Sequence, residues 1–336
     1  MEPLAIDSNV DCTLIVPATS VEDVDANDPP NQMLEDFTIA FQTSTPGCYV
    51  DVDGDNVTDF DSADHTALQA AHDSVASGST LRVAGECRGA QVHQRSSGST
   101  IPNEIMLEVN KSIIITGGWD VNNGDPIWDV PADPVAYPAI LSADNRGHVI
   151  YVDDGYSGRR YNLTLDGVTV QDGTLAVGSG GGVYIYDGRL TIRRSTFQNN
   201  TAASSGGAIY KSSTTNKVDI TDSIFVNNQA SYGGAIAISY APTTILNSTF
   251  YNNSATQGGA LWIDRTQMNL INSTLSNNLA TRYGSAILAE LFVSVQITNT
   301  TITGNMGSPA LDPGEYARVD DEIILRNIIV AGNHGG

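Results

Sequence analysis

Basic residues, cysteines and long apolar runs are all scarce in this chain of 336 residues. Only 16 lysines and arginines stand against 38 acidic residues, which gives a formal net charge of −22 at pH 7. Such a charge opposes binding to phosphate, so neither nucleic acid nor an anionic membrane surface is an expected partner. No apolar run approaches the length that spans a bilayer, so membrane insertion is not expected either.

Cysteine occurs only at Cys12, Cys48 and Cys87. No Cys-x-x-Cys pair is present, so a structural zinc site has no support. Cys48 opens the first recognisable motif and Cys87 follows the first expected strand, so we expect them to form a disulfide in an oxidising compartment. Cys12 is then an odd thiol, and the sequence does not decide whether it is free.

The sequence does contain a repeat, which fills residues 180–333. A Phe-x-x-Asn segment or a close variant recurs at residues 197–200, 225–228, 250–253, 275–278, 302–305 and 330–333. Between these segments lies a glycine pair followed by alanine and an aliphatic residue, at residues 206–209, 233–236 and 258–261, with serine as the second residue at 284–287. A nearly fixed period of this size indicates a stacked repeat architecture.

Each repeat holds short alternations of apolar and polar residues and no helix-length segment; Leu190 and Ile192, for example, flank Thr191. This period of two predicts strands with one buried face, and one repeat has room for three of them. Because a single repeat cannot bury its own apolar face, every strand must lie parallel to its copy in the next repeat. The sequence therefore predicts an all-β solenoid, a parallel β-helix.

Alignment of the repeats predicts four apolar columns inside this helix. The first two columns are Leu163, Leu190, Val218, Thr243, Met268, Val295, Ile323 and Leu165, Ile192, Ile220, Ile245, Leu270, Ile297, Leu325. The other two are Val170, Phe197, Phe225, Phe250, Leu275, Ile302, Val330 and Val183, Ile209, Ile236, Leu261, Ile287. We expect the last asparagine of each segment to turn a corner in the left-handed conformation and to form a ladder of stacked amides. The glycine pair marks a second corner that needs positive φ or close backbone approach.

The alternation of Gly-Gly-Ala-Ile/Leu with Phe-x-x-Asn resembles the repeats of the polymorphic outer-membrane protein family. More broadly, it is similar to right-handed β-helix proteins of the pectin-lyase-like superfamily. Residues 54–59, Gly-Asp-Asn-Val-Thr-Asp, and residues 67–71, Ala-Leu-Gln-Ala-Ala, resemble the start of pectin-lyase-like chains, although Asn56 replaces a glycine and four extra residues intervene. The resemblance implies a right-handed coil and a secreted or cell-surface protein, whose signal peptide we expect to lie outside this sequence.

Four parts are expected along the chain. Residues 1–47 form an irregular acidic segment, 48–88 an N-terminal cap with a helix and the first strand, 89–160 early coils with long loops, and 161–336 the regular repeats. The helix begins at His65, is capped by Ser62 or Asp61, ends at Gly78 and covers the open end of the solenoid.

The start of the cap also resembles a calcium-binding loop. Asp51, Asp53, Asp55 and Asp59 occupy the first, third, fifth and ninth positions of such a loop, which makes Ca²⁺ the one cofactor that the sequence indicates. The sixth position is Asn56 rather than glycine, and the twelfth is not acidic. The alternative is a solvated turn whose carboxylates lie near the start of a helix.

Tyr184, Tyr210 and Trp262 are candidate ligand-binding residues. They belong to an outward column, completed by Ala237 and Leu288, that follows the first residue of the strand after each glycine pair. Exposed aromatic rings in a row stack against sugar rings or dock a partner. The alternative is that this column is packed under a loop.

No catalytic residue is assigned. The strings Asn-Thr-Asp, Gly-His-Gly and Arg-Ile-Lys of polygalacturonase-type hydrolases are absent. One group of charged and amide residues lies on successive or adjoining rows: Arg159, Arg160, Asp166, Asp187, Arg193, Asp222 and Asn247. It is suited to holding a cation or to acid–base chemistry, but it is equally explained as screened surface charge.

The preferred functional interpretation is an extracellular or cell-surface structural or adhesive protein, with surface glycans or further copies of itself, end to end or side by side, as partners. The alternative is a polysaccharide-binding or polysaccharide-degrading protein, either a lyase or a hydrolase. The fold implied by the resemblance serves all of these functions, so the missing catalytic strings favour the non-enzymatic interpretation.

Overall fold

The computed structural model describes residues 11–16, 37–42, 47–94, 100–122, 124–152, 160–212, 216–315 and 321–334. The chain separates into two units, of which the first is residues 1–46 with 122–125 and the second is residues 47–121 with 126–336. In the first unit, β1 (Asp11–Val16) pairs with β2 (Phe37–Gln42) in antiparallel register. The segment expected to be irregular thus contains a strand pair. Cys12 lies in β1, for which only the backbone is described.

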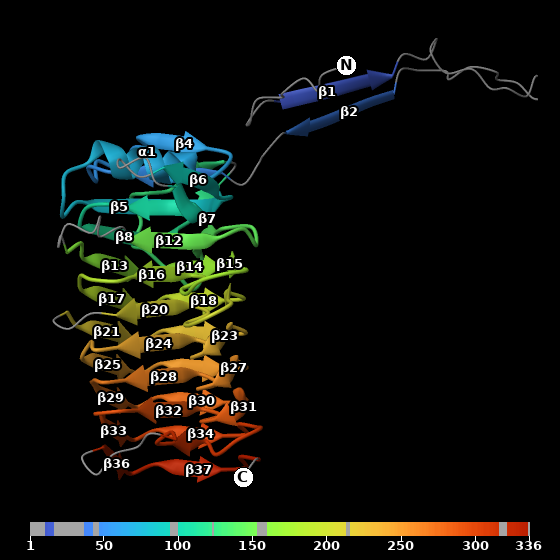
Figure 1. Ribbon diagram of the computed structural model, residues 1–336. Helices are drawn as coiled ribbons and strands as arrows, with labels where there is room; N and C mark the ends of the chain where they lie inside the picture. The colour runs from blue at the N-terminus through green and yellow to red at the C-terminus, as the bar shows by residue number, and fades with distance from the viewer. Residues whose placement is uncertain are drawn as a thin grey trace, which may run out of the picture. The chain divides into compact units, whose positions relative to one another are not determined.

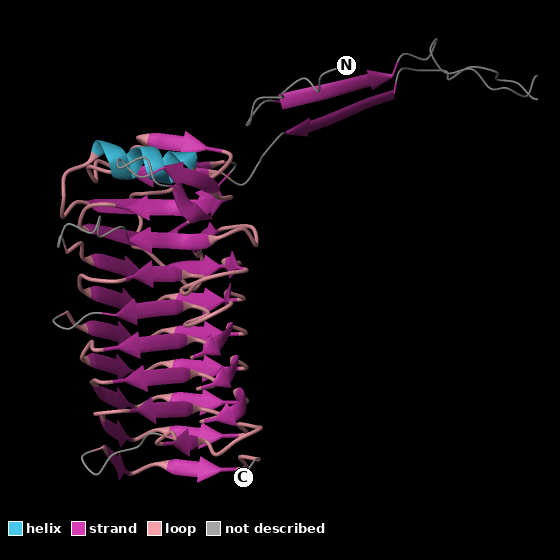
Figure 2. Cartoon of the chain, in the orientation of Figure 1, coloured by secondary structure: helices cyan, strands magenta, loops and turns pink. Residues whose placement is uncertain are grey.

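The second unit is a parallel β-helix, in which strands repeat row after row (Figures 1 and 2). The strands form four stacks, which we number by their order within a row. Stack 1 contains β8 (Ile113–Trp119), β13 (Leu163–Asp166), β17 (Leu190–Arg193), β21 (Val218–Thr221), β25 (Thr243–Leu246), β29 (Gln267–Ile271), β33 (Ser294–Thr298) and β36 (Glu322–Arg326). Stack 2 contains β11 (Ala139–Ser142), β14 (Val168–Gln171), β18 (Thr196–Gln198), β22 (Ile224–Val226), β26 (Thr249–Tyr251), β30 (Thr274–Ser276), β34 (Thr301–Thr303) and β37 (Ile329–Ala331).

Stack 3 is an additional strand in each row, which the sequence pattern did not predict. It contains β15 (Thr174–Leu175), β19 (Thr201–Ala202), β23 (Gln229–Tyr232), β27 (Ser254–Gln257) and β31 (Leu279–Tyr283). Stack 4 contains β6 (Gln91–Gln94), β7 (Thr100–Val109), β12 (His148–Val152), β16 (Val183–Ile185), β20 (Ile209–Ser212), β24 (Ile236–Ser239), β28 (Leu261–Asp264), β32 (Ile287–Glu290) and β35 (Leu311–Asp312). Stack 3 escaped prediction because its strands bury mainly one alanine per row, which leaves little apolar alternation.

The strand register confirms all four predicted apolar columns. Leu190 lies opposite Leu163 in the preceding row, and Ile236 lies opposite Ile209. In stack 2, Phe197, Phe225 and Phe250 are fully buried, and their ring centroids are 5.0 and 4.8 Å apart in successive pairs. Each such ring stabilises the fold by about 1.5–3 kcal/mol through burial, so the repeated phenylalanine is a main source of row-to-row cohesion.

The asparagine corner, between stacks 2 and 3, differs from the prediction in one respect. The left-handed residue is the penultimate one of each segment, with φ of 56° at Asn199 and 55° at Asn252. The last asparagine is buried instead and forms the expected ladder: each side-chain Nδ2 donates to the Oδ1 of the next row at 2.9–3.1 Å, from Asn200 to Asn305. The penultimate residue therefore turns the chain, and the last asparagine forms the ladder. The two roles fall on different residues because a buried amide in the ladder has no freedom to turn the chain.

The glycine pair turns the corner between stacks 3 and 4, and its two residues also differ. The first glycine has positive φ, for example 62° at Gly233, where a side chain is strained. At Gly234 the backbone φ is ordinary, but a Cβ atom would overlap the carbonyl oxygen of Gly259 in the next row. Positive φ and close approach, which the sequence left as alternatives, thus both occur.

The cap consists of β3 (Cys48–Asp51), β4 (Phe60–Ser62), α1 (Thr66–Ser74) and β5 (Thr80–Arg88), followed later by the short pair β9 (Val121–Asn122) and β10 (Asp125–Pro126). The predicted Cys48–Cys87 disulfide is present. Leu68 and Ala71 of α1 are buried against the interior of the coil, so the helix covers its end as expected (Figure 1).

The predicted N-cap and the predicted end of the helix are wrong, whereas the expected start at His65 lies one residue from the observed one. Helix α1 begins at Thr66 and ends at Ser74, where Val75 is already extended. Ser62 Oγ still accepts a hydrogen bond from the Ala67 amide at 3.0 Å, but as a residue of β4 rather than as the N-cap. Gly78 has a positive φ and donates its amide to Ser112 O in the following row. In the described part of the chain, no helix is long and apolar enough to cross a bilayer.

Candidate functional site

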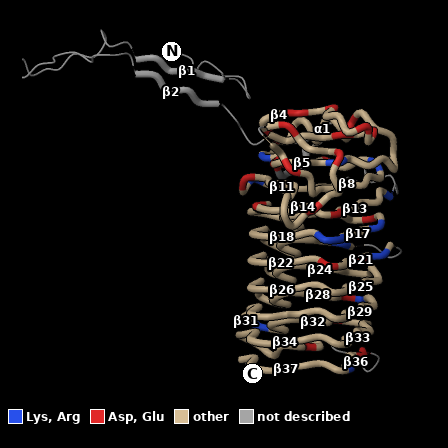
Figure 3. The backbone as a smooth tube through the Cα atoms, turned by 180° about the vertical axis from the view of Figure 1, so that it is seen from behind, with Lys and Arg blue, Asp and Glu red and all other residues tan. Residues whose placement is uncertain are grey.

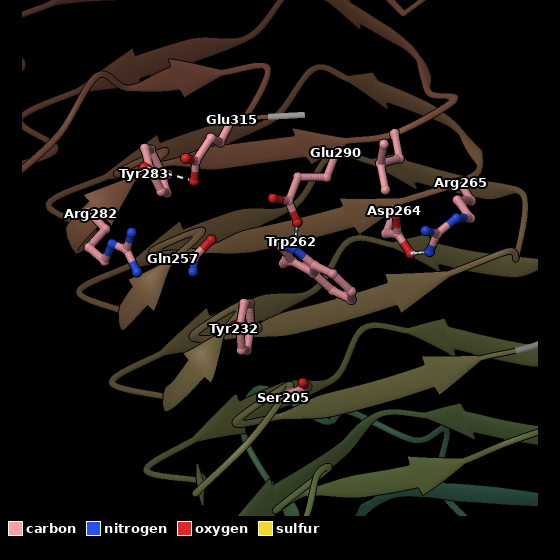
Figure 4. Close-up of a pocket in the computed structure, with 11 residues that line it drawn as sticks. Ser205, Tyr232, Gln257, Trp262, Asp264, Arg265, Arg282, Tyr283, Glu290 and Glu315 are labelled. Atoms are coloured by element: carbon pink, nitrogen blue, oxygen red, sulfur yellow. Dashed lines mark hydrogen bonds and ion pairs between the residues drawn. The ribbon is translucent and has the colours of Figure 1, made fainter. Parts of the chain in front are cut away.

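A cleft of 530 Å³ lies across the glycine-pair corner of the later rows (Figure 4). One wall is formed by the residues that immediately precede the glycine pairs in four consecutive rows, namely Ser205, Tyr232, Gln257 and Tyr283, with Arg282 beside them. The opposite wall comes from stack 4 and the residues that follow it, namely Trp262, Asp264, Arg265, Glu290 and Leu291, and Glu315 lies at one end. Because the glycines between the walls carry no side chains, the corner remains hollow.

Trp262 is held firmly in the stack 4 wall of this cleft. Its indole Nε1 donates a hydrogen bond to Glu290 Oε2 at 2.8 Å, one row further along. The ring of Tyr232 meets it edge-on, with centroids 5.6 Å apart and an interplanar angle of 61°. The indole is half-buried, so its position is fixed while part of the ring stays accessible.

Asp264 is the most buried charged group in the cleft, with 4% of its surface exposed. Its Oδ2 accepts hydrogen bonds from Ser239 Oγ at 2.9 Å and from Arg265 Nη1 at 2.7 Å. Its Oδ1 is buried and has no hydrogen-bond partner among the described residues. Burial raises the pKa of Asp264, while the bond from Ser239 and the charge of Arg265 oppose this rise.

Asp264 lies directly opposite Glu290 in the strand register, so two carboxylates occupy neighbouring rows beside Trp262. At the other end of the cleft, the Arg282 guanidinium lies 5.2 Å from the centre of the Tyr283 ring. The Tyr283 hydroxyl donates to Glu315 Oε2 at 3.3 Å. The cleft thus combines aromatic faces with carboxylates and guanidinium groups, a composition that binds polar ligands with flat apolar surfaces.

Comparison with known families agrees with this architecture. Residues 148–314, from β12 to just beyond β35, match the family model described as the right-handed β-helix region. The chain is a parallel β-helix protein, and about half of it is similar to this family. Neither the search of curated proteins nor the search of solved structures gave a match. The resemblances to polymorphic outer-membrane protein repeats and to pectin-lyase-like chains therefore stay predictions.

Of the three predicted ligand-binding residues, the β-helix places only Trp262 in the cleft. Tyr184 and Tyr210 form a separate ladder with Tyr151, in which successive ring centroids are 4.9 and 5.4 Å apart. Ala237 occupies the row between Tyr210 and Trp262 and breaks the aromatic series. The register of the predicted column is correct, but its aromatic members belong to two different surfaces.

The expectation that this whole column faces solvent is wrong. Ala237 and Leu288 are fully buried on the outer side of stack 4. The turn at Gly314 lies over Leu288, because a Cβ atom on that glycine would be 3.4 Å from Leu288 Cδ1. Ala237 carries only a methyl group between two large rings of neighbouring rows. Exposure thus depends on side-chain size and on loops outside the column.

Sequence reasoning missed most of the cleft residues, including Tyr232, Arg282, Asp264 and Glu290. Two signals were available. The position before each glycine pair repeats as Ser205, Tyr232, Gln257 and Tyr283, and the position two residues after the Trp262 column repeats as Ser212, Ser239, Asp264 and Glu290. Their convergence was hidden because the two positions belong to different stacks, on either side of the glycine corner.

Three of the four residues of the predicted calcium loop come together. Oxygen atoms of Asp51, Asp53 and Asp59 lie within 4.8 Å of one another, whereas Asp55 is outside this group. Asp51 is fully buried, and its Oδ1 accepts the Gly54 amide at 2.7 Å. The loop therefore folds around a buried carboxylate.

Arg82 already supplies a positive charge to this loop. Its Nη1 donates to Asp51 Oδ2 and to Asn56 Oδ1, both at 2.8 Å, and its guanidinium lies 4.7 Å from the centre of the Trp119 ring. A bound Ca²⁺ would share Asp51 with this guanidinium, which weakens the attraction of the loop for a cation. Calcium binding stays a prediction.

The group of charged residues noted in the sequence resolves into surface pairs. Arg160 pairs with Asp187 at 3.1 Å, and Asn247 donates to Asp222 at 3.0 Å. Arg194, rather than the expected Arg193, shares the corner position of Asp222 and pairs with Asp166 at 2.8 Å. Figure 3 shows basic positions near β17 and β21 and acidic ones around β4 and α1. Arg159 lies outside the described residues. Exposed pairs of this kind add little stability. Asp166 and Arg193 nevertheless line a second cleft, of about 460 Å³, over stack 1.

Proposed function

We propose that this β-helix protein is an extracellular or cell-surface adhesive protein that binds saccharides in the Trp262 cleft. The observation that carries the proposal is the indole itself, which is half-buried, hydrogen-bonded to Glu290 and braced by Tyr232. A fixed aromatic face surrounded by hydrogen-bonding groups suits the apolar face and the hydroxyl rim of a sugar ring. The Cys48–Cys87 disulfide fits an oxidising compartment.

The scaffold favours such binding because it holds the cleft rigid. Trp262 and Glu290 belong to strands that pair in register with each other, so neither side chain has to be ordered by the ligand. Tyr232 comes from stack 3, whose rows are joined to stack 4 by the glycine corner. A site that is ordered before binding loses less entropy when the ligand arrives.

Replacement of Trp262 tests this function. Titration of neutral, acidic and amine-bearing oligosaccharides, followed by isothermal calorimetry, should find ligands whose affinity falls at least about tenfold in Trp262→Ala. The matched control is Tyr251→Ala, which removes an exposed aromatic ring from stack 2 and should leave affinity unchanged. Unchanged binding by Trp262→Ala, or no binding by any member of the panel, contradicts the proposal.

A second candidate function is polysaccharide cleavage, and the Asp264–Glu290 pair favours it. The raised pKa of the buried Asp264 suits a proton donor, and Glu290 is a carboxylate on the neighbouring row. The measurement is release of reducing ends from a polysaccharide panel, with Asp264→Asn as the variant that should abolish it. Equal release by wild type and variant would reject this assignment.

Association with further copies of the chain is the other proposed partnership. Sedimentation velocity over a wide range of protein concentration measures it directly. Growth of the sedimentation coefficient with concentration supports assembly, and a constant monomer value rejects it.

A further inference from the structure

The charges that line the cleft are divided unequally between its two ends. At the Trp262 end, Asp264 and Glu290 lie in neighbouring rows, and Arg265, bonded to Asp264, is the one cation among the lining residues there. At the other end, Arg282 and Glu315 offset each other around Tyr283. The formal charge beside the indole is therefore negative by one unit.

The buried Asp264 carboxylate adds a second, independent indication. Its Oδ1 lacks a hydrogen-bond partner within the described structure, although the residue is almost fully buried at the wall of the cleft. Ser239 and Arg265 donate only to Oδ2, and burying the other oxygen without a donor is unfavourable. A cation placed in the cleft next to Asp264 would lower this cost.

Trp262 offers the complementary surface for the same cation. Indole is the aromatic ring that attracts cations most strongly, and here its nitrogen is already bonded to Glu290. A ligand amine beside this ring would meet the π face and two carboxylates together. An acidic group at the same place would be repelled by both carboxylates and by a chain whose net charge is −22.

We infer that the cleft selects saccharides that carry a protonated amine, such as hexosamine units with free amino groups. This inference rests on the proposed saccharide binding and names the ligand class of that same site. The sugar ring lies against Trp262, and the ammonium group lies on the side of Glu290 and Asp264. Arg282, at the other end, remains available for hydroxyl groups further along the chain of sugars.

The test compares three oligosaccharides of equal length: β-1,4-linked glucosamine, its fully N-acetylated counterpart, and an oligouronate. The free-amine ligand should bind at least about tenfold more tightly than the N-acetylated one at low ionic strength. Raising NaCl to about 0.5 M should narrow this difference, because exposed charges are then screened. The oligouronate should bind most weakly.

Glu290→Gln should reduce the preference for the free amine, since the amide keeps an acceptor for the Trp262 indole but loses the charge. Asp264→Asn should act in the same direction, and near-ultraviolet circular dichroism checks that the buried substitution leaves the fold intact. Glu322→Gln is the control, because it removes an exposed carboxylate from stack 1, away from the cleft.

Three negative outcomes are distinguishable. If the N-acetylated ligand binds as tightly as the free amine and Trp262→Ala abolishes both, the inference is overturned and saccharide binding stands. If Glu290→Gln and Asp264→Asn leave a clear amine preference unchanged, the assignment to these carboxylates is overturned. If none of the three ligands binds and a wider saccharide panel also fails, the proposed function itself falls.

Discussion

Asn252 and Asn253 carry the same side chain and perform different tasks one residue apart. Asn252 is exposed and turns the chain at a φ of 55°. Asn253 is fully buried, donates to Phe225 O and Asn278 Oδ1, and accepts from the backbone and side chain of Asn228, each at 3.0 Å. The two positions should therefore tolerate substitution very differently.

Asn253→Ala is expected to lower the free energy of unfolding by about 3 kcal/mol or more, because it leaves buried groups of Asn228 and Phe225 without partners. Urea denaturation followed by circular dichroism measures this loss. The control is Asn252→Gly, which keeps the positive φ and should change stability by less than about 1 kcal/mol. Equal effects at the two positions would contradict the division of tasks.

Lys211 is a fully buried lysine whose side chain points into the coil. Its neighbours in the register are Ile185 and Ile238, and its Nζ donates to Tyr186 O at 3.0 Å. Burial lowers the pKa of Lys211 from 10.5 to about 8, although the charge of Asp187 partly opposes this. Between these two values the unfolded chain binds a proton that the folded chain does not, so stability rises with pH across this window.

Lys211→Met should therefore stabilise the protein at neutral pH, by on the order of 3 kcal/mol, and should remove the rise in stability between pH 8 and 10.5. Methionine keeps a long flexible chain, so packing is largely preserved. The measurement is the denaturation midpoint of wild type and variant at intervals through this pH range, which shows how the stability of each depends on pH. If stability depends on pH in the same way in both proteins, burial of the Lys211 ammonium group does not destabilise the fold as expected.

At the scale of elements, the glycine pair decides how the rows turn and also creates the cleft. The second glycine is fixed by close approach, since a Cβ atom at Gly234 would overlap the carbonyl oxygen of Gly259. Ser285 occupies the same position two rows later, where the following row has no glycine pair. A side chain is accepted only where the neighbouring row leaves room for it.

Gly234→Ala is expected to destabilise the protein by about 3 kcal/mol, because the added methyl group forces the rows apart. Ser285→Ala is the matched control and should cost only about 1 kcal/mol, since it removes a single hydrogen bond to Ser308 O. Thermal denaturation of both variants measures the contrast. Two similar melting temperatures would argue against close packing at this corner.

The acidic loop of the cap allows an equally direct test of calcium binding. We expect calorimetric titration to show weak Ca²⁺ binding, with a dissociation constant on the order of a millimolar, that is lost in Asp53→Asn with Asp59→Asn. Asp55→Asn is the control, because Asp55 lies outside the three converging carboxylates. Absence of heat up to millimolar Ca²⁺ would contradict calcium binding by this loop. Arg82 would then be the sole cation that the loop needs.

At the scale of the whole molecule, a net charge of −22 should make stability depend on salt. Repulsion among 38 acidic residues opposes the compact state, and added salt screens it. The melting temperature is expected to rise as NaCl increases from low concentration to about 0.5 M. A fall would mean that favourable ion pairs, such as Arg189 with Asp219, outweigh the general repulsion.

The sequence by itself determined the solenoid, the contents of its apolar columns and the asparagine ladder. It could do so because each row meets only its neighbours, so a regular period places equivalent residues opposite one another, as Phe197, Phe225 and Phe250 show. The Cys48–Cys87 disulfide followed from the position of the two cysteines at the ends of the cap.

Only the tertiary structure decided where the candidate site lies. Tyr232 and Trp262 meet across a corner that joins two stacks, and their contact depends on stack 3, whose strands bury too few apolar residues to leave a pattern. The burial of Asp264 and the covering of Leu288 by the Gly314 turn depend likewise on side chains and loops outside their own columns. Periodicity specifies which residues stack along the helix, whereas a cleft is formed by residues that differ from row to row.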